Sequence, residues 1–343
     1  MPIRAWAAKR NQNRPGGWDD FGRSARISTG EPVDWKRKAT IQRVCAKLPA
    51  KDAVYYFLQR RFGSLRHAPD PLPNIRAAGE IFAEMGKLGF RPAAKRVMEV
   101  GTGRRLDMPI AFYLCGAKSV DTFDLNPYLR EEIVLSAIAA MAERRQETLD
   151  ALGPVAAEGL AGRLDRLSKV KSLGDLRALA DIRYHAPADA SRTGLASGSI
   201  DLQFSYTVFE HIPGPVVCAI LRECSRVLAP GGVACHHIDP SDHFAHEDRS
   251  IGLIHFLRYE EAEWSHYNDN QFAYHNRLRR DDYNRLYAEA GHEIFHRRPF
   301  LDDASLAELK NGFPLASPFR GQDPENLCTV VYRVYSRPGG EGN

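Results

Sequence analysis

Val97-Met98-Glu99-Val100-Gly101-Thr102-Gly103 is the segment from which the fold of this chain is inferred. It has the pattern of a buried strand that runs into a glycine turn. A second apolar run, Val120 to Phe123, ends at Asp124. Glycines let a backbone approach a ligand closely, and an acid at the tip of the next strand can accept hydrogen bonds from ribose hydroxyls. The pattern therefore predicts an α/β protein that holds an adenosine-containing cofactor.

Three further segments follow in a fixed order. They are Asp189-Ala190 before an apolar strand at 199–205, then Val208-Phe209-Glu210-His211-Ile212-Pro213, then Leu228-Ala229-Pro230-Gly231-Gly232 before a strand at 233–239. As a set they resemble the class I S-adenosylmethionine-dependent methyltransferases, of the type 11-like kind that carries a Glu-His segment and an L-x-P-G-G turn. The resemblance is strong over about 95–240 and looser over 276–337.

The resemblance implies an α/β fold, a Rossmann-like three-layer sandwich with a seven-stranded, mostly parallel sheet and an N-terminal helical cap. The expected divisions are a flexible basic segment at 1–40, the cap at 41–92 and the methyltransferase domain at 93–337. Insertions are expected near 149–180 and 240–275. The leucines of the first insertion fit either surface helices that close the core, which we favour, or a cap over the substrate.

The same resemblance implies that S-adenosylmethionine is the cofactor and assigns its contacts by position. The methionine part is assigned to Glu99, Gly101, Thr102 and Gly103, and the ribose to Asp124. The adenine is assigned to Leu125, Asp189 and Ala190, and the transferred methyl group to Ser205 and Tyr206. Arg105 stands where the family usually has a third glycine. Either Arg104 or Arg105 meets the donor's carboxylate, or both face solvent.

Methyl transfer needs a nucleophile placed in line and, for some acceptors, removal of a proton. The candidate catalytic residues are His237, His211 and Asp239, with His236 a further candidate. Strand alternation places one of His236 and His237 in the core and the other near the cleft. A structural hydrogen bond within its loop is the alternative for His211. The spacing of His and Asp over 236–243 matches no known metal pattern, so no metal is expected.

The acceptor is expected to be an oxygen or nitrogen of a small-molecule or carbohydrate substrate. No Asn/Asp-Pro-Pro-Tyr/Phe stands at 205–208 and no Pro-Cys follows the fourth strand, which argues against the usual DNA base chemistries. Aromatic and arginine residues over 244–280 suit either a polar ring or phosphate substrate, or a packed lid. This segment, together with the expected helix around Tyr55 to Arg61, resembles decorations of bacterial methyltransferases associated with surface-polysaccharide synthesis. The alternatives are an RNA or other nucleic-acid methyltransferase and a catalytically inactive S-adenosylmethionine-binding protein; Leu106 opposes a dehydrogenase.

Composition adds few constraints. The net charge is +4, yet residues 1–47 hold eleven Lys and Arg against four acids, which is the feature that favours the nucleic-acid alternative. The six cysteines are scattered with no CxxC, which fits a reducing compartment. No signal-peptide h-region or membrane-length apolar run is present, so we expect a cytoplasmic protein without a membrane span. The oligomeric state is left open.

Overall fold

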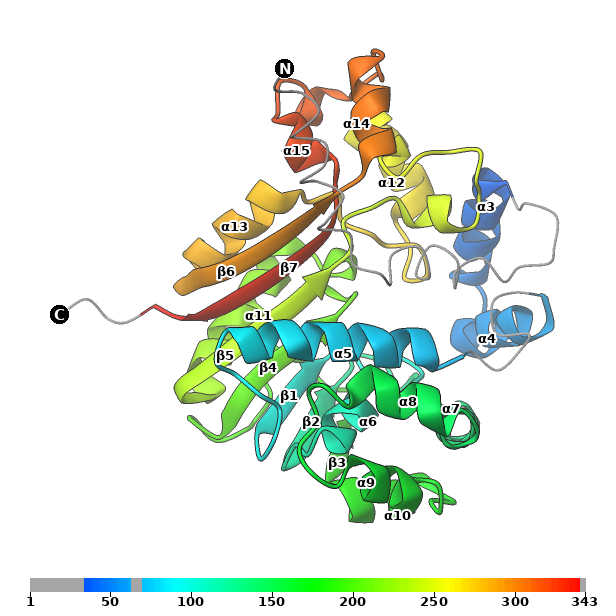
Figure 1. The fold of residues 1–343 in the computed structure, drawn as a ribbon. Coiled ribbons are helices and arrows are strands. Elements are labelled where there is room, and N and C mark those ends of the chain that lie inside the picture. The colour runs from blue at the N-terminus through cyan, green and yellow to red at the C-terminus, as the bar shows by residue number, and fades with distance from the viewer. Residues whose placement is uncertain (1–33, 63–69, 340–343) are drawn as a thin grey trace, which may run out of the picture.

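A seven-stranded sheet is the centre of the molecule in the computed structural model, which describes residues 34–62 and 70–339 (Figure 1). The strand order is β3-β2-β1-β4-β5-β7-β6. Neighbouring strands are parallel except that β7 runs antiparallel to both β5 and β6. The strands are β1 (Arg96–Val100), β2 (Ser119–Phe123), β3 (Ile182–His185), β4 (Ile200–Tyr206), β5 (Leu228–Ile238), β6 (His292–Leu301) and β7 (Thr329–Pro338).

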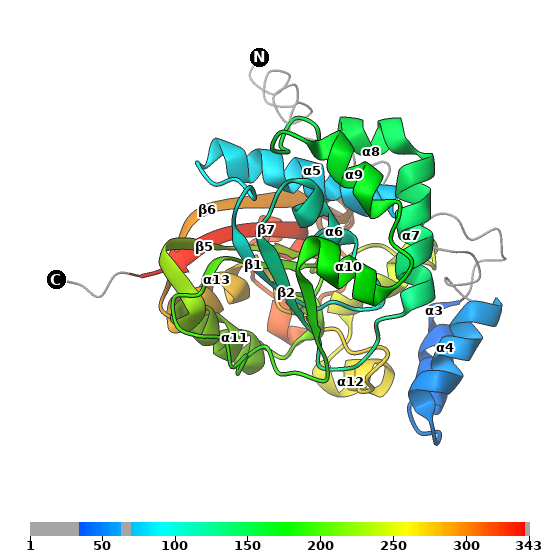
Figure 2. The ribbon, with the colours of Figure 1, turned by 90° about the horizontal axis from the view of Figure 1, so that it is seen from below.

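Helices cover both faces of this sheet, as Figure 2 shows from below. One side carries α5 (Leu72–Lys87), α6 (Asp107–Leu114), α7 (Glu131–Glu143), α8 (Arg145–Leu152), α9 (Leu160–Leu167) and α10 (Leu173–Ala180). The other carries α11 (Gly214–Val227) and α13 (Arg280–Glu289). Two separate clusters of buried apolar side chains fill the two interfaces. The predicted three-layer, Rossmann-like sandwich is confirmed.

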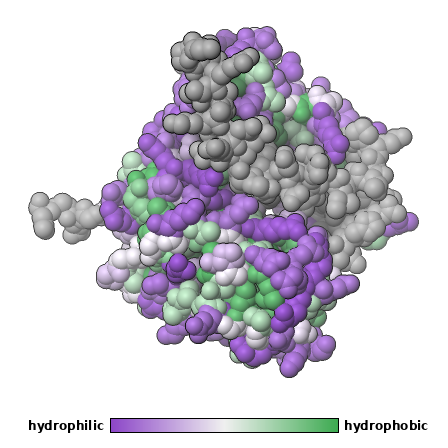
Figure 3. Space-filling view, in the orientation of Figure 1, coloured by the Kyte–Doolittle hydropathy of each residue, from purple (hydrophilic) through white to green (hydrophobic). Residues whose placement is uncertain are grey.

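The insertion near 149–180 packs against the core. Leu152, Leu164, Leu167 and Leu176 of α8, α9 and α10 are buried in the cluster that also contains α5 and α6. This packing agrees with the favoured interpretation of helices that close the core. On the face drawn in Figure 3, apolar residues show between hydrophilic ones in the lower half, where these helices lie.

A turn separates β2 from the next helix, because α7 begins only at Glu131. The Asp124 carboxylate accepts a hydrogen bond from the Asn126 N–H at 2.9 Å. Such a side-chain bond two residues on holds the backbone in a turn, which delays the helix.

A third apolar cluster lies beyond the carboxyl ends of the strands. It joins α3 (Trp35–Cys45) to η3 (His243–His246), η4 (His255–Arg258), α12 (Glu261–Asn268), α14 (Asp303–Lys310), η5 (Ser317–Phe319) and α15 (Pro324–Leu327). The Trp35 ring centroid lies 4.8 Å from that of Tyr267 and 5.5 Å from that of Phe244. The backbone N–H of Trp35 also donates to the Asp248 carboxylate at 2.9 Å. Residues of the 240–275 insertion thus anchor helix α3.

The predicted flexible segment at 1–40 needs a correction at its end. Residues 35–40 are helical because Asp34 caps α3, accepting from the Arg37 N–H at 3.0 Å, and because Trp35 is buried. Residues 1–33 lie outside the described residues. The division into a cap and a methyltransferase domain stays a prediction; the cap region contains α3, α4 (Lys51–Phe62) and α5, and α5 packs directly on the sheet core.

Two further sequence expectations concern cysteines and membranes. All six cysteines are buried and free. Within 34–62 and 70–339, no helix combines the length and the apolar character that crossing a bilayer would require.

Candidate active site

A cavity of about 900 Å³ opens where β1, β2, β3 and β4 end. The strand order reverses between β1 and β4, and ligands of open α/β sheets bind at such a switch point, outside the carboxyl ends of the strands. Every predicted cofactor residue except Ser205 lines this cavity: Glu99, Gly101, Thr102, Gly103, Asp124, Leu125, Asp189, Ala190 and Tyr206. Ser205 is fully buried in the sheet, opposite Val100 and His236.

The glycine turn after β1 requires glycine for two reasons. Gly101 and Gly103 have φ angles of 88° and 62°, in the region that side chains disfavour. A Cβ on Gly101 would also lie 2.3 Å from a methyl carbon of Val208. The turn is held at its ends, because the Gly101 N–H donates to the Phe123 carbonyl at 2.8 Å and the Gly103 N–H donates to the Asp124 carboxylate at 2.7 Å.

A buried hydroxyl chain ends on the carboxyl group of Glu99. The Thr122 hydroxyl donates to Glu99 at 2.5 Å, and the Thr102 and Thr122 hydroxyl oxygens lie 2.6 Å apart. A hydroxyl has one proton, so Thr102 is the donor to Thr122. Burial raises the pKa of Glu99 to about 8. Glu99 therefore holds a proton at neutral pH, and a cation beside it would favour its ionised form.

We expect stability to fall as pH rises across the titration of Glu99. The pKa in the folded protein is raised from an ordinary 4.5 to about 8, so the stabilisation is complete below about 4.5 and is lost as pH rises toward 8. Glu99→Gln removes this dependence while keeping an oxygen that accepts from Thr122. Urea unfolding gives the free energy of unfolding at pH 5 and at pH 8.5. The fall between these two pH values should be smaller in the variant than in the wild type by roughly 2 kcal/mol or more. Equal losses in both proteins would contradict the assignment.

Next to the glycine turn, the cavity wall combines an acid with an exposed apolar side chain. Both oxygens of Asp124 accept from backbone N–H groups, of Gly103 and Asn126, and each keeps a further lone pair. Leu125 leaves 70% of its surface exposed, which is unusual for a large apolar residue. A flat apolar group bound here would cover it.

Arg104 and Arg105 both line the cavity but differ in what holds them. Arg105 pairs with the buried carboxylate of Asp107 and donates to the Asp70 carbonyl at 3.0 Å. The Arg104 guanidinium lies over two aromatic rings, 5.2 Å from the Tyr56 centroid and 5.7 Å from that of Tyr128. Burial lowers the pKa of Arg104.

A smaller cavity of about 220 Å³ adjoins the first, and His211 and Phe272 line both. Imidazoles gather around it: the ring centroid of His243 lies 4.9 Å from that of His211 and 4.3 Å from that of His275. Burial, together with the neighbouring His243, lowers the pKa of His211 to about 4. Its Nδ1–H donates to the Tyr274 carbonyl at 3.0 Å, which is the loop hydrogen bond considered from the sequence.

Two of the three predicted catalytic residues, His237 and Asp239, line neither cavity, so their catalytic role stays a prediction. His237 stacks under Tyr206 with 4.8 Å between ring centroids, and Arg333 donates to its Nδ1 at 3.4 Å. Burial and the Arg333 charge lower the pKa of His237 to about 3, so it is a poor proton acceptor. Asp239 is buried, and its carboxylate accepts from Ser241 at 2.5 Å.

His236 is the core member of the histidine pair, as strand alternation predicted. It is fully buried between the Tyr287 hydroxyl, 2.5 Å from Nδ1, and the Gln203 amide oxygen, 3.1 Å from Nε2. His237 faces the other way and reaches the cleft only through Tyr206.

The sequence did not single out several residues that line the first cavity. Thr207 at the end of β4 has a φ of 52°, rare for a β-branched residue and the kind of strain that clusters at functional sites. Gln271 and Phe272 come from the second insertion, and Phe272 stacks on Tyr55 of α4 at 4.1 Å between centroids. In the sequence, only the unusual aromatic content of 240–275 indicated that this segment could form part of the cavity wall.

The arginines at 277–280 hold loops together and are not arranged around a substrate. Arg279 is fully buried and donates to the carbonyls of Leu327 at 3.0 Å and Thr329 at 2.8 Å. Arg277 donates to the Phe256 carbonyl at 3.1 Å. This arrangement agrees with the packed lid and not with a phosphate site.

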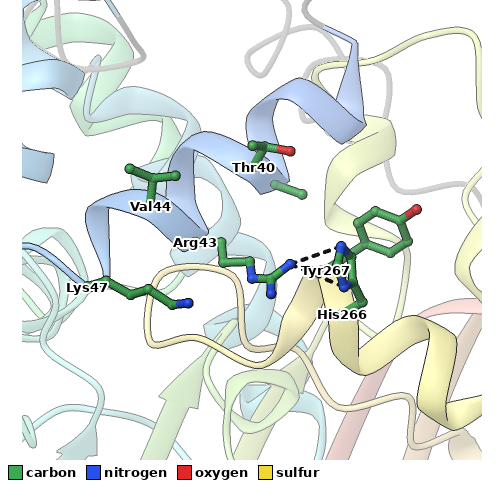
Figure 4. Close-up of a pocket in the computed structure, with 7 residues that line it drawn as sticks. Thr40, Arg43, Val44, Lys47, His266 and Tyr267 are labelled. Carbon is green, nitrogen blue, oxygen red and sulfur yellow. Dashed lines mark hydrogen bonds between the residues drawn. The ribbon is translucent and has the colours of Figure 1, made fainter.

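A separate pocket of about 300 Å³ lies between α3 and α12 and shares no residue with either cavity. Figure 4 shows Arg43 of α3 facing the ring of His266, with Nη1 2.9 Å from Nε2, and Lys47 on the same side. His266 thus belongs to a different environment from the histidines near the cleft.

Comparison with known proteins adds one sequence match and several structural likenesses. A family model described as a methyltransferase domain matches residues 167–236, which run from the end of α9 into β5. No curated protein matches the chain by sequence.

The solved structures similar to this chain share little sequence with it. A putative methyltransferase from Bacillus halodurans is 15% identical, with 74% of this chain and 95% of that one covered and a TM-score of 0.37. A putative sarcosine dimethylglycine methyltransferase from Galdieria sulphuraria is 15% identical, covering 77% and 86%, with a TM-score of 0.42. An S-adenosylmethionine-dependent methyltransferase from Mesorhizobium loti is 12% identical, covering 77% and 99%, with a TM-score of 0.39.

The family match covers β3, β4 and α11, while the glycine turn and Asp124 lie outside it, on β1 and β2 of the same sheet. The matched segment and the strands that form the cavity therefore belong to the same sheet. Residues 167–236 of this chain match a methyltransferase domain, and the sheet to which they belong has a Rossmann-like fold.

Proposed function

We propose that the chain transfers a methyl group from S-adenosylmethionine to an oxygen or nitrogen of a small-molecule or carbohydrate acceptor. The observation that carries this proposal is the pair of adjoining cavities. The larger is lined by all but one of the predicted cofactor residues, and the smaller opens beside it at His211 and Phe272.

The chemistry of the larger cavity fits the donor. We propose that Asp124 holds the ribose hydroxyls through its remaining lone pairs and that Leu125 packs on the adenine. Asp189 and the Ala190 amide would bind the adenine edge, and Glu99 would face the donor's ammonium group. When bound, the donor supplies a methyl group on a sulfonium, which is already electrophilic.

The residues of this chain then have two tasks, namely to orient the donor and to place the acceptor in line. We propose that Tyr206 positions the methyl end, since it lines the larger cavity and stacks on His237. His237 is then a positioning residue. Of the three histidine and aspartate candidates, His211 is the one with access to the acceptor side.

The size of the second cavity favours a small acceptor over a nucleic-acid strand. At about 220 Å³, it has room for a small polar group and is walled by Tyr55, Phe272 and Trp264. The nucleic-acid alternative depends on the basic residues at 1–47, most of which lie outside the described residues.

Isothermal titration with S-adenosylmethionine and with S-adenosylhomocysteine tests the donor half of the proposal. We expect micromolar binding of both, and formation of S-adenosylhomocysteine from the donor when hydroxylated small molecules and nucleotide sugars are screened. Binding of neither ligand would overturn the proposal. RNA binding that weakens steeply with salt, with methylation of RNA, would support the nucleic-acid alternative.

A further inference from the structure

Glu210, His211 and His243 bring three potential metal-ligand atoms together, all within 4.8 Å of one another. They come from two loops that follow neighbouring strands, η2 (Phe209–His211) after β4 and η3 after β5. The group lies where the two cavities meet, because His211 lines both and His243 lines the smaller one.

Glu210 has no partner that explains its burial. Its side chain is fully buried, and among the described residues neither carboxylate oxygen has a hydrogen-bond partner. A carboxyl group buried in this way keeps its proton, is paired with a cation or coordinates a metal. One nitrogen each of His211 and His243 lies within 4.8 Å of a Glu210 carboxyl oxygen.

The imidazole of His211 is oriented as a ligand. Its Nδ1–H donates to the Tyr274 carbonyl at 3.0 Å, which leaves the Nε2 lone pair for a metal. Metal-binding histidines usually donate their second nitrogen to a carbonyl or carboxylate in this way. Asp239 lies close to His243, with 3.6 Å between the carboxylate oxygen and Nε2.

His275 adds a fourth group beside these three. It is buried, and neither ring nitrogen has a hydrogen-bond partner in the described part of the chain. Asn268 fixes its backbone, donating to the His275 carbonyl at 2.9 Å and accepting from its N–H at 2.8 Å. The next residue donates its N–H to the Glu210 carbonyl at 2.7 Å, so the two segments are tied together.

We propose that Glu210, His211 and His243, with His275 as a further ligand, bind a divalent transition-metal ion at the junction of the two cavities. One carboxylate with two or three imidazoles suits Zn²⁺, Mn²⁺, Fe²⁺ or Co²⁺ better than Mg²⁺, which prefers oxygen ligands. Ligands about 2.0–2.2 Å from one ion lie at most about 4.4 Å apart. For Glu210, His211 and His243 the observed spacing is therefore within a side-chain adjustment of a bound geometry, and the His275 ring centroid lies 4.3 Å from that of His243.

The role of this ion rests on the proposed methyl transfer, whereas the metal site itself does not. An acceptor hydroxyl bound to the ion loses its proton to water more readily. Its oxygen then attacks the methyl carbon while the carbon–sulfur bond breaks and sulfur keeps the electron pair. No strong side-chain base is needed, which agrees with the poor basicity of His237.

The test is metal binding by the full chain after removal of metals with a chelator. We expect Co²⁺ to bind with one ion per chain and a visible absorption spectrum of imidazole coordination, and Mn²⁺ or Zn²⁺ to compete for the site. Glu210→Gln and His243→Ala should each weaken Co²⁺ binding by at least about 100-fold. His266→Ala, in the separate pocket of Figure 4, should leave it unchanged.

Stability of the metal-free protein separates loss of a ligand from loss of the fold. Glu210→Gln removes an unpartnered carboxyl group, so its metal-free melting temperature should equal or exceed that of the wild type, and Co²⁺ should raise only the wild-type value. Absence of stoichiometric Co²⁺ binding, or equal binding by Glu210→Gln and wild type, would overturn the proposal. Donor titration of the metal-free protein reports separately on the proposed function, because Asp124 and the glycine turn are not ligands.

Discussion

Gly101→Ala is expected to lower the affinity for S-adenosylmethionine by about 30- to 100-fold, which corresponds to about 2–3 kcal/mol of binding free energy. The new Cβ would lie 2.3 Å and 2.7 Å from the two methyl carbons of Val208, and the residue would keep a φ of 88° that L side chains disfavour. The turn must move away from Val208 to relieve the close contact and the unfavourable φ angle. That movement changes the shape of the donor cavity. Isothermal titration measures the loss.

Two comparison variants separate the clash from backbone strain. Gly89 has a similar φ of 84°, an added Cβ there would meet no heavy atom within 4 Å, and the residue lies outside the cavity. Gly89→Ala should therefore cost about 1–2 kcal/mol of stability with unchanged donor affinity. Val208→Ala in the Gly101→Ala background removes the closest atoms and should recover part of the affinity. Wild-type affinity in Gly101→Ala itself would contradict the placement of the donor.

Asp124→Ala is expected to reduce donor affinity by about 100-fold or more. Hydrogen bonds to charged groups contribute about 1.5–3 kcal/mol each, and two ribose hydroxyls would lose their acceptor. The substitution also frees the Gly103 N–H, now bound to the carboxylate at 2.7 Å, so the glycine turn loses its anchor. Titration calorimetry with S-adenosylhomocysteine gives the comparison without turnover.

Asp201→Ala is a matched control for the loss of a carboxylate. Asp201 binds Arg96 through three hydrogen bonds of 2.8–2.9 Å at the amino end of β1, and it does not line the cavity. We expect lower stability and unchanged donor affinity. Equal donor affinity in Asp124→Ala and wild type would remove Asp124 from the binding site.

Most of the wall of the larger cavity could be predicted from sequence because its determinants are local. A strand, a glycine turn and an acid at the next strand's end are encoded within Val97–Asp124, and parallel strands bring their carboxyl ends to one edge. Strand alternation also separated His236 from His237. Ser205, assigned with Tyr206 to the methyl group, is buried in the sheet and does not line the cavity, whereas Tyr206 does.

Local patterns of residues were thus sufficient to specify the sheet, its glycine turn and most of the wall of the larger cavity. The smaller cavity became visible only in the folded molecule, because its residues are distant along the chain. The Glu210 and His275 segments are joined by hydrogen bonds between two loops, and Trp35 docks α3 on the second insertion. Those contacts join segments that are far apart in the sequence, and no periodicity or turn pattern in the sequence records which of its histidines will meet.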